Sequence, residues 1–256
     1  MDGVAPEEWK LYPLNYGEAL SIDKPVFVLQ KGFGEKLKAP YTGWLLDNGE
    51  EKIVVDAGAW EPATTKKYHH YDVVGTGSEA VEKAIAARGL TPDAVGVVLL
   101  THLHWDHVVN VDLFTNATFY VQEEEVSYAL NPLPTHRLAY EVGLGFQPPW
   151  HKVLHRMKLL NGDVEVRPGL TCCLLPGHTP GSQGFLVNTS AGKYLIAGDT
   201  VDLRENWEGD EQFRHRPGGI YVDLRAYWDT LTRMEGLADV VLPSHDYSIF
   251  DQEEYP

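Results

Sequence analysis

The feature that most constrains this chain is a histidine-rich segment, residues 101–107, directly after an apolar run typical of a buried strand. Side chains two residues apart share a face of an extended chain, so His102 and His104 can point at one ion. Asp106 and His107 come where the strand should end and the chain can turn back toward a second point. Imidazole and carboxylate ligands without a nearby cysteine suit Zn²⁺, Fe or Mn. The spacing predicts a metal site in preference to a polar loop that is rich in histidine by chance.

Three further apolar runs end in a residue that can bind metal. His178 follows the first on a turn bounded by glycine and proline, Asp199 ends the second and His245 ends the third. A lone histidine after a strand is more often structural, but the set in this order is a strong pattern. Because each residue stands where a strand leaves the core, we expect the side chains to meet at one edge of a rigid sheet scaffold.

The order His102-x-His104-x-Asp106-His107, His178, Asp199, His245 resembles the metallo-β-lactamase superfamily. The resemblance covers most of the chain and implies an α/β fold, an αββα sandwich of two similar halves, in one domain of residues 1–256. It also implies two divalent metal ions per chain, with zinc as first choice and iron, manganese or cobalt as alternatives. In the family pattern one ion is held by His102, His104 and His178 and the other by Asp106, His107 and His245, Asp199 bridges them, and Asp56 supports a ligating histidine.

Within the superfamily the chain looks most like the quorum-quenching N-acyl homoserine lactonases. The likeness rests on a similar chain length, on residues 204–207 (Arg-Glu-Asn-Trp) and on residues 244–246 (Ser-His-Asp). One position differs from the pattern of those lactonases. They usually have a tyrosine three residues after the bridging aspartate, and this chain has Asp202 there. A carboxylate cannot donate a hydrogen bond to an oxyanion unless it is protonated. The resemblance therefore carries over the metal site and leaves the acyl homoserine lactone substrate open.

The reaction that we expect is hydrolysis without a serine nucleophile, since the chain has no Gly-x-Ser-x-Gly motif. Two metal ions about 3.5 Å apart can share a hydroxide at neutral pH and bind the oxygen of the electrophile. The hydroxide would open a cyclic ester (lactone) or a related cyclic amide, and Asp106 would pass a proton to the leaving group. With no tyrosine at position 202, the carbonyl could be held by a tyrosine elsewhere or by the metal alone. The catalytic candidates are Asp106, Asp199, Asp202, Tyr221 and Tyr247.

Three other functions stay open at this point. Hydrolysis of a non-cyclic ester or thioester would match glyoxalase II, which has a similar Gly-His-Thr-Pro-Gly-Ser run but adds a C-terminal helical domain, for which the sequence after His245 is too short. Iron-dependent oxygen or persulfide chemistry is disfavoured by His104, where the flavin-linked di-iron branch usually has a glutamate. A non-catalytic binding protein would be expected to lose ligands, and none is lost here. Metal content and the inertness of metal-free protein separate these classes.

Composition limits the partners. The formal net charge is −16, which disfavours nucleic acid and favours a neutral or weakly charged small molecule. No apolar run approaches the roughly 20 residues that span a membrane, so no membrane contact is expected. The first residues show no signal peptide, and the only cysteines, Cys172 and Cys173, are neighbours that a strand would point to opposite faces. We therefore expect no disulfide and a cytoplasmic protein.

Strands and helices are predicted to alternate in two halves. The expected strands are 25–30, 43–46, 52–56, 95–100, 118–121, 171–175, 183–188, 193–197 and 240–242, and the expected helices are 78–88, 106–113, 122–130 and 223–237. Two long stretches, residues 57–76 and 131–157, are expected to be irregular and are rich in aromatic residues and histidine. Loops of this length are usually functional or disordered, and the aromatics argue against disorder. We expect them to be walls of the substrate site or arms of a homodimer.

Overall fold

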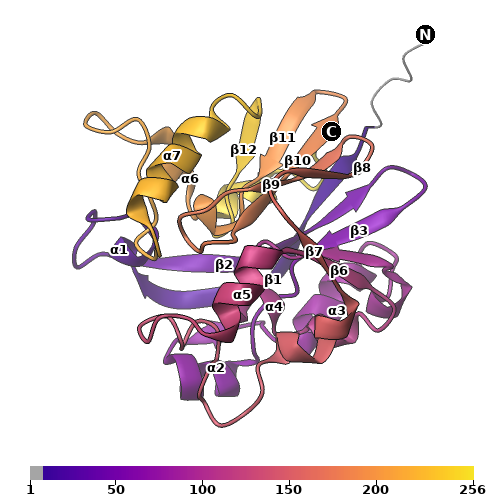
Figure 1. Cartoon of the computed structure of the whole chain (residues 1–256), viewed down its shortest axis with the longest axis horizontal. Coiled ribbons are helices and arrows are strands. Elements are labelled where there is room, and N and C mark those ends of the chain that lie inside the picture. The colour runs from indigo at the N-terminus through magenta and orange to yellow at the C-terminus, as the bar shows by residue number, and fades with distance from the viewer. Residues whose placement is uncertain (1–7) are drawn as a thin grey trace.

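Two β-sheets stack face to face in the computed structural model, which describes residues 8–256 (Figure 1). The larger sheet has seven strands in the order β4-β1-β2-β3-β5-β6-β7, with antiparallel pairing from β4 to β3 and parallel pairing from β3 to β7. Its strands are β1 (Lys10–Asp23), β2 (Lys36–Asp47), β3 (Lys52–Val55), β4 (Val73–Val74), β5 (Val97–Leu99), β6 (Thr118–Gln122) and β7 (Met157–Leu160).

The smaller sheet has five strands in the order β12-β11-β10-β9-β8, antiparallel except for the parallel pair β11 and β12. They are β8 (Val164–Arg167), β9 (Leu170–Leu174), β10 (Gln183–Thr189), β11 (Gly192–Ile196) and β12 (Val240–Leu242). Cys172 and Cys173 of β9 are both free and buried, and they belong to cores on opposite faces of this sheet. The expectation that a strand points them to opposite faces is confirmed.

Helices cover the two outer faces (Figure 1). The alternation of side chains along a strand divides the core, since Ile53 and Val55 lie between the sheets while Val54 faces the helices. α3 (Ser78–Ala86), α4 (Trp105–Val108) and α5 (Glu123–Leu130) contribute buried residues to the core on the larger sheet, and α7 (Leu224–Met234) to the core on the smaller one. This layering is the predicted αββα sandwich.

The remaining helices are short. They are α1 (Lys24–Phe27), α2 (Pro62–His69) and α6 (Arg204–Glu208), with the 3₁₀ turns η1 (Pro92–Ala94), η2 (Val111–Leu113), η3 (Pro149–Arg156), η4 (Gly198–Thr200) and η5 (Tyr247–Asp251). Among residues 8–256, no helix combines the length and the apolar character that crossing a membrane requires. The expectation of no signal peptide concerns residues 1–7, which lie outside the described residues.

Several predicted elements are wrong. Residues 25–30 form no strand, because Pro25 stands in the first turn of α1, where its fixed φ and missing N–H fit a helix. The long strand β1 was not predicted, and residues 57–76 contain α2 and β4. The predicted helix 106–113 divides into α4 and η2, where the amide of Asn110 donates to the carbonyls of Ala57 and Ala59.

Candidate metal centre

The seven side chains proposed as ligands from the sequence meet at one edge of the sandwich. They come from four segments that follow strands of both sheets: the loop after β5 with α4, the β9–β10 turn, η4 after β11, and the loop after β12. Gly177 lets the β9–β10 turn pack closely, because a Cβ there would lie 2.4 Å from the Cα of Tyr227. The rigid strand ends thus bring together residues that are far apart in the chain.

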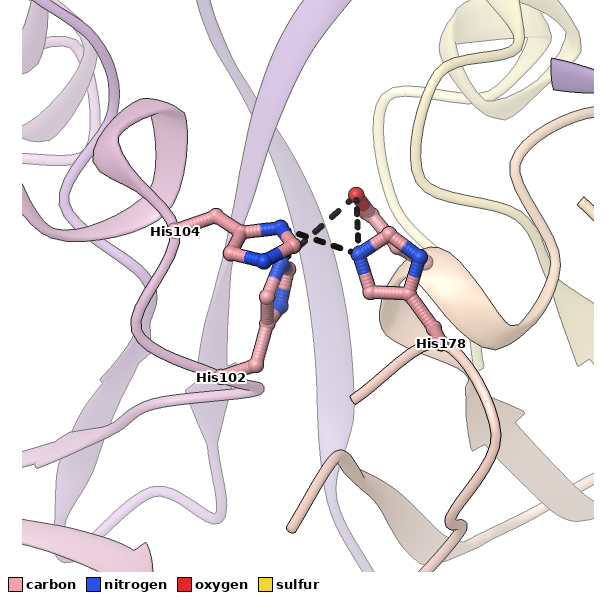
Figure 2. Close-up of side chains that lie close together, drawn as sticks. His102, His104 and His178 are labelled. Atoms are coloured by element: carbon pink, nitrogen blue, oxygen red, sulfur yellow. Dashed lines mark hydrogen bonds and ion pairs between the residues drawn. The ribbon is translucent and has the colours of Figure 1, made fainter. Parts of the chain in front are cut away.

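The first ligand cluster is His102, His104, His178 and Asp199, whose donor atoms all lie within 4.8 Å of one another. His178 Nε2 is 3.0 Å from His104 Nδ1 and 3.5 Å from Asp199 Oδ2, and His102 Nε2 is 3.7 Å from the same oxygen. Figure 2 shows the three rings converging, with His102 and His104 from one side and His178 from the other. The centre therefore joins both halves of the fold.

The second ligand cluster is Asp106, His107 and His245, with donor atoms within the same 4.8 Å limit. Asp199 reaches it with its other oxygen, since Oδ1 is 3.2 Å from His107 Nε2 and 3.3 Å from His245 Nε2. Asp106 Oδ2 lies 4.0 Å from each of these nitrogens. Asp199 thus turns one carboxylate oxygen to each cluster, which is the arrangement that a bridging ligand needs.

The donor set fits divalent metal ions. Within residues 8–256, the buried atoms His102 Nε2, His107 Nε2 and Asp199 Oδ1 have no hydrogen-bond partner. Buried polar atoms normally have one, because leaving one unpaired costs stability. Imidazole nitrogen and carboxylate oxygen are the donors that Zn²⁺ and similar ions take. Ions at the two clusters would satisfy these atoms.

Asp56 holds the ring of His107, as expected from the sequence. Its Oδ2 lies 2.8 Å from His107 Nδ1. The backbone N–H and the hydroxyl of Thr101 each donate to this carboxylate at 2.8 Å. A carboxylate on Nδ1 keeps the proton there and leaves Nε2 for the cluster.

Backbone carbonyls orient two other rings in the same way. His178 Nδ1 donates to Ile220 O at 3.0 Å, and His245 Nδ1 donates to Pro40 O at 2.9 Å. A carbonyl oxygen can only accept, so Nδ1 of both rings carries a proton. Nε2 of each ring therefore faces the centre as an acceptor when the imidazole is neutral.

The histidines of the first cluster are held neutral. Burial lowers the pKa of His102 and of His104 well below the ordinary value, and neighbouring imidazoles act in the same direction. Burial also lowers the pKa of His178, although Asp199 opposes the effect. Metal ions bind the neutral form, so no proton competes at this cluster near neutral pH.

The second cluster has the opposite character. Burial lowers the pKa of His107 and of His245, but the charge of Asp199 outweighs it, with help from Asp106. The pKa of His107 lies well above its ordinary value, and that of His245 is raised to about 9. Burial raises the pKa of Asp199, but these imidazoles outweigh burial and hold it well below the ordinary value.

Glu125 ties the two halves of the centre together and was not found from the sequence. Its buried carboxylate accepts from Leu103 N (3.0 Å) and the Tyr140 hydroxyl (2.9 Å), and on the other side from the Thr179 hydroxyl (2.5 Å) and Gly181 N (3.2 Å). Leu103 lies between two ligands of the first cluster and Thr179 follows the third. Three consecutive glutamates at the start of a helix read as solvent-exposed, so no local signal distinguishes this one.

Asp202 is buried beside the clusters. Its carboxylate, Asp199 and His245 offer donor atoms within 4.8 Å of one another. Burial and the charge of Asp199 raise the pKa of Asp202 well above its ordinary value. A Cβ at Gly218 would lie 2.6 Å from Asp202 Oδ2, so only glycine leaves room for the carboxylate in this position.

The two tyrosine candidates lie farther out. Tyr221 is partly exposed on the wall of a cavity beside the centre, whereas the exposed Tyr247 hydroxyl donates to Glu18 and lines neither cavity there. A third tyrosine, Tyr227, is completely buried and donates to the backbone O of Asp199 at 2.7 Å. Its helical spacing in α7 reads as an ordinary core residue, so the sequence offered no sign of this contact.

Two adjoining cavities open onto the centre. The inner cavity, of about 80 Å³, is bordered by Asp106, Asp199, Asp202 and His245, and the outer cavity, of about 560 Å³, by His69, Thr135, His136 and Tyr221. Tyr71, His104, Trp105, Ala139, His178 and Ile220 border both, so the two are continuous. This space can hold a small substrate next to both ligand clusters.

Parts of the two long aromatic stretches form walls of the outer cavity, as one of the two expectations proposed. His69 and Tyr71 come from the first stretch, and residues 135, 136, 138 and 139 from the second. Trp150 instead is buried in the core, and Phe146 packs against Trp60 and Tyr68. Trp150 therefore does not line the cavity, because the 3₁₀ turn η3 directs it inward.

Comparison with known proteins identifies the family of this chain. The family model for the metallo-beta-lactamase superfamily matches residues 40–245. The N-acyl homoserine lactonase AttM of Agrobacterium fabrum is 30% identical over 196 residues, which cover 70% of this chain and 72% of that protein. The N-acyl homoserine lactonase AiiA of Bacillus thuringiensis subsp. kurstaki is 29% identical over 191 residues, which cover 70% and 71%. The chain belongs to the metallo-beta-lactamase superfamily.

Solved structures show the same fold. An N-acyl homoserine lactone hydrolase with the product N-hexanoyl-L-homoserine at its catalytic metal centre superposes with a TM-score of 0.74 at 23% identity, covering 94% of this chain and 95% of that one. AidC, a dizinc quorum-quenching lactonase, superposes with a TM-score of 0.69 at 16% identity, covering 95% and 90%. At this identity the likeness concerns the fold.

Proposed function

We propose that this protein is a dinuclear metal-dependent hydrolase that opens a lactone or a related cyclic amide. The observation that carries the proposal is the position of Asp199, which turns one oxygen to each of two histidine clusters. In each cluster one buried ring nitrogen, His102 Nε2 or His107 Nε2, lacks a hydrogen-bond partner. The superfamily match and the lactonases among the relatives favour hydrolysis of a cyclic ester. The substrate would be a neutral or weakly charged small molecule.

The ligand assignment follows from the two clusters. We assign one ion to His102, His104 and His178 and the other to Asp106, His107 and His245, with Asp199 between them; zinc is the first choice for these donors. Bound divalent ions supply a hydroxide nucleophile at neutral pH and polarise the carbonyl oxygen of the substrate. The cytoplasm is the proposed compartment, and the two unpaired cysteines support it.

The chain's own side chains position the substrate and move a proton. Asp106 borders the inner cavity and is the most exposed carboxylate of the two clusters, with 17% of its side chain exposed. It is therefore placed to deliver a proton to the leaving alkoxide or amide. Trp105 and Tyr71 border both cavities and offer aromatic surface to a substrate at the point where the cavities join.

A screen of the metal-loaded enzyme tests the function. Lactones, cyclic imides and thioesters are followed with a pH indicator, because each hydrolysis releases an acid. We expect a lactone or cyclic amide to reach kcat/KM of roughly 10⁴ M⁻¹s⁻¹ or more and the metal-free protein to be inert. Preference for thioesters would support the glyoxalase II-like alternative, and iron-dependent oxygen uptake would support the oxidative one.

Asp202 is proposed to select the substrate. It borders the inner cavity where the related lactonases usually have a tyrosine. Burial raises its pKa in the metal-free protein, but two divalent ions beside it would favour the carboxylate, which would repel an oxyanion. A substrate with an N–H, a hydroxyl or a positive charge at this point would instead bind it, and such a site discriminates strongly against analogues that lack the group. We expect polar cyclic esters or amides to exceed ordinary acyl homoserine lactones at least tenfold in kcat/KM.

The matched variants for this expectation are Asp202→Tyr and Asp202→Ala. Asp202→Tyr should raise the rate with acyl homoserine lactones, because it restores a phenol donor for the carbonyl. Asp202→Ala should lower the rate with the polar substrates alone. Efficient hydrolysis of acyl homoserine lactones by the wild type, unchanged in Asp202→Ala, would contradict the proposal.

A further inference from the structure

We propose that His69 is a specificity-determining residue, which accepts a hydrogen bond from an N–H or O–H on the part of the substrate that occupies the outer cavity. The inference rests on the proposed hydrolysis of a lactone and names a substrate feature for it. His69 is the last residue of α2, lies in one of the long aromatic stretches, and lines the outer cavity although it is only 5% exposed. None of the seven ligand assignments involves it.

The ring of His69 is fixed from two directions. Its plane stacks on Trp105, with centroids 4.0 Å apart and an interplanar angle of 14°. Its Nε2 lies 3.0 Å from Glu141 Oε1. Trp105 stands between two proposed ligands, and its backbone N–H donates to Ala139 O at 2.9 Å. His69 is therefore held directly over the metal-binding segment.

Glu141 fixes which nitrogen of His69 is left for a ligand. The indole N–H of Trp60 donates to Glu141 Oε1 at 2.6 Å, so this oxygen is an acceptor. His69 Nε2 at the same oxygen must then carry the proton. With the proton on Nε2, Nδ1 is the acceptor nitrogen of the neutral ring; it makes no hydrogen bond with residues 8–256 and stays accessible at the outer cavity that His69 lines. A substrate donor in the outer cavity supplies the missing partner.

Glu141, which holds the ring of His69, has two features that lower the stability of the fold. Glu141 is 1% exposed and adopts a φ of 60°, in the left-handed region that non-glycine residues rarely occupy. A strained backbone and a buried carboxylate are both unfavourable, and such features concentrate at functional sites. Glu141 belongs to the second aromatic stretch, and its contacts with Trp60 and His69 connect it to the first. A packing role alone would be served by an apolar residue at position 69.

The test uses pairs of lactones that differ in one donor on the ring substituent. One pair compares an amide with the ketone that has CH₂ in place of N–H, and another compares a hydroxyl with hydrogen. The variant His69→Phe keeps an aromatic ring for Trp105 and removes the acceptor. The matched control His70→Asn removes the exposed neighbouring imidazole, at a left-handed position that asparagine tolerates.

We expect the wild type to prefer the donor-bearing member of at least one pair by about tenfold or more in kcat/KM. His69→Phe should abolish that preference, mainly through KM, because the hydrogen bond forms in the ground state as well as in the transition state. It should leave the donor-free member within about twofold and the metal content unchanged. His70→Asn should behave as wild type.

His69→Phe leaves the buried carboxylate of Glu141 without its histidine, which could destabilise the fold. The double variant His69→Phe/Glu141→Gln removes this charge as well. It should show the same loss of preference. If His69→Phe lowered kcat/KM equally for both members of a pair, His69 would have only a packing role and the inference would be overturned. A wild type that prefers neither member of any pair would overturn it too. If the wild type hydrolyses no lactone at all, the proposed function fails, and this inference falls with it.

Discussion

The two ligand clusters use the same residue types but differ in their charge state. The first, centred on His102, His104 and His178, faces other imidazoles and holds histidines with lowered pKa. In the second, His107 and His245 face carboxylates and have raised pKa. All five rings are buried, so the neighbours of each histidine decide whether a proton competes with metal there.

The largest expected effect comes from removing the residue that the clusters share. Asp199→Ala deletes the oxygen that faces each cluster, so the second ion should bind poorly and kcat should fall at least roughly 10²–10³-fold. Elemental analysis should show fewer than two ions per chain. Asp229→Ala, on the exposed face of α7, is the control. Near-normal turnover of Asp199→Ala would contradict the dinuclear assignment.

The pH dependence of metal binding should separate the clusters. With a pKa of about 9 for His245 and a raised value for His107, protons compete with the second ion throughout the neutral range. Its affinity should rise roughly tenfold or more per pH unit from 7 toward 9, whereas the first cluster should respond little. Competition with a chelator at several pH values measures both. Two equal pH dependences would remove the distinction between the clusters.

The same pKa predicts the stability of the metal-free protein. His245 is raised from 6.5 to about 9, so the folded state binds this proton more tightly than the unfolded state. Its stabilising contribution is complete below about pH 6.5 and is lost as the pH rises through 9. Urea unfolding of the metal-free protein should thus show a lower free energy of unfolding at pH 9.5 than at pH 6.5. Saturating metal should abolish or reverse this trend.

Asp56→Asn should weaken the second cluster selectively. The amide removes the charge beside His107 and can present N–H to Nδ1, so the ring loses its orientation. Substitutions of such supporting residues typically cost 10–100-fold in metal affinity. Loss of one ion per chain, with the first retained, is the expected result. Asp47→Asn, at the end of β2, is the control, and equal weakening of both ions would contradict the assignment of Asp56 to one cluster.

Changes in the aromatic stretches should leave both clusters intact and have the smallest effect on catalysis. Phe146→Ala should alter KM less than about tenfold with two ions still bound, because Phe146 packs behind the cavity wall against Trp60 and Tyr68. Trp150→Ala should instead cost about 3–5 kcal/mol of unfolding free energy, because its side chain is 1% exposed. Light scattering on both variants tests the remaining expectation that these stretches form a homodimer.

The local pattern predicted the fold best where strand and ligand coincide. The apolar run before His102 became β5, and the runs before His178, Asp199 and His245 became β9, β11 and β12. Prediction failed at α1, α2 and β1, whose residues alternate less clearly between apolar and polar. The short helices α1 and α2 each have a proline in their first turn, a start signal that is independent of hydrophobic periodicity.

By itself, the sequence determined which residue types can bind metal and that each follows a strand, because these are local properties of spacing and hydrophobicity. How these residues face one another depends on the packing of the two sheets. The two oxygens of Asp199 face different histidines, which come from three other segments of the chain. Glu125 and Glu141 support the site through hydrogen-bond partners up to 81 positions away. A carboxylate that is ordinary along the chain acquires its role and its pKa from desolvation and from neighbours that folding places beside it.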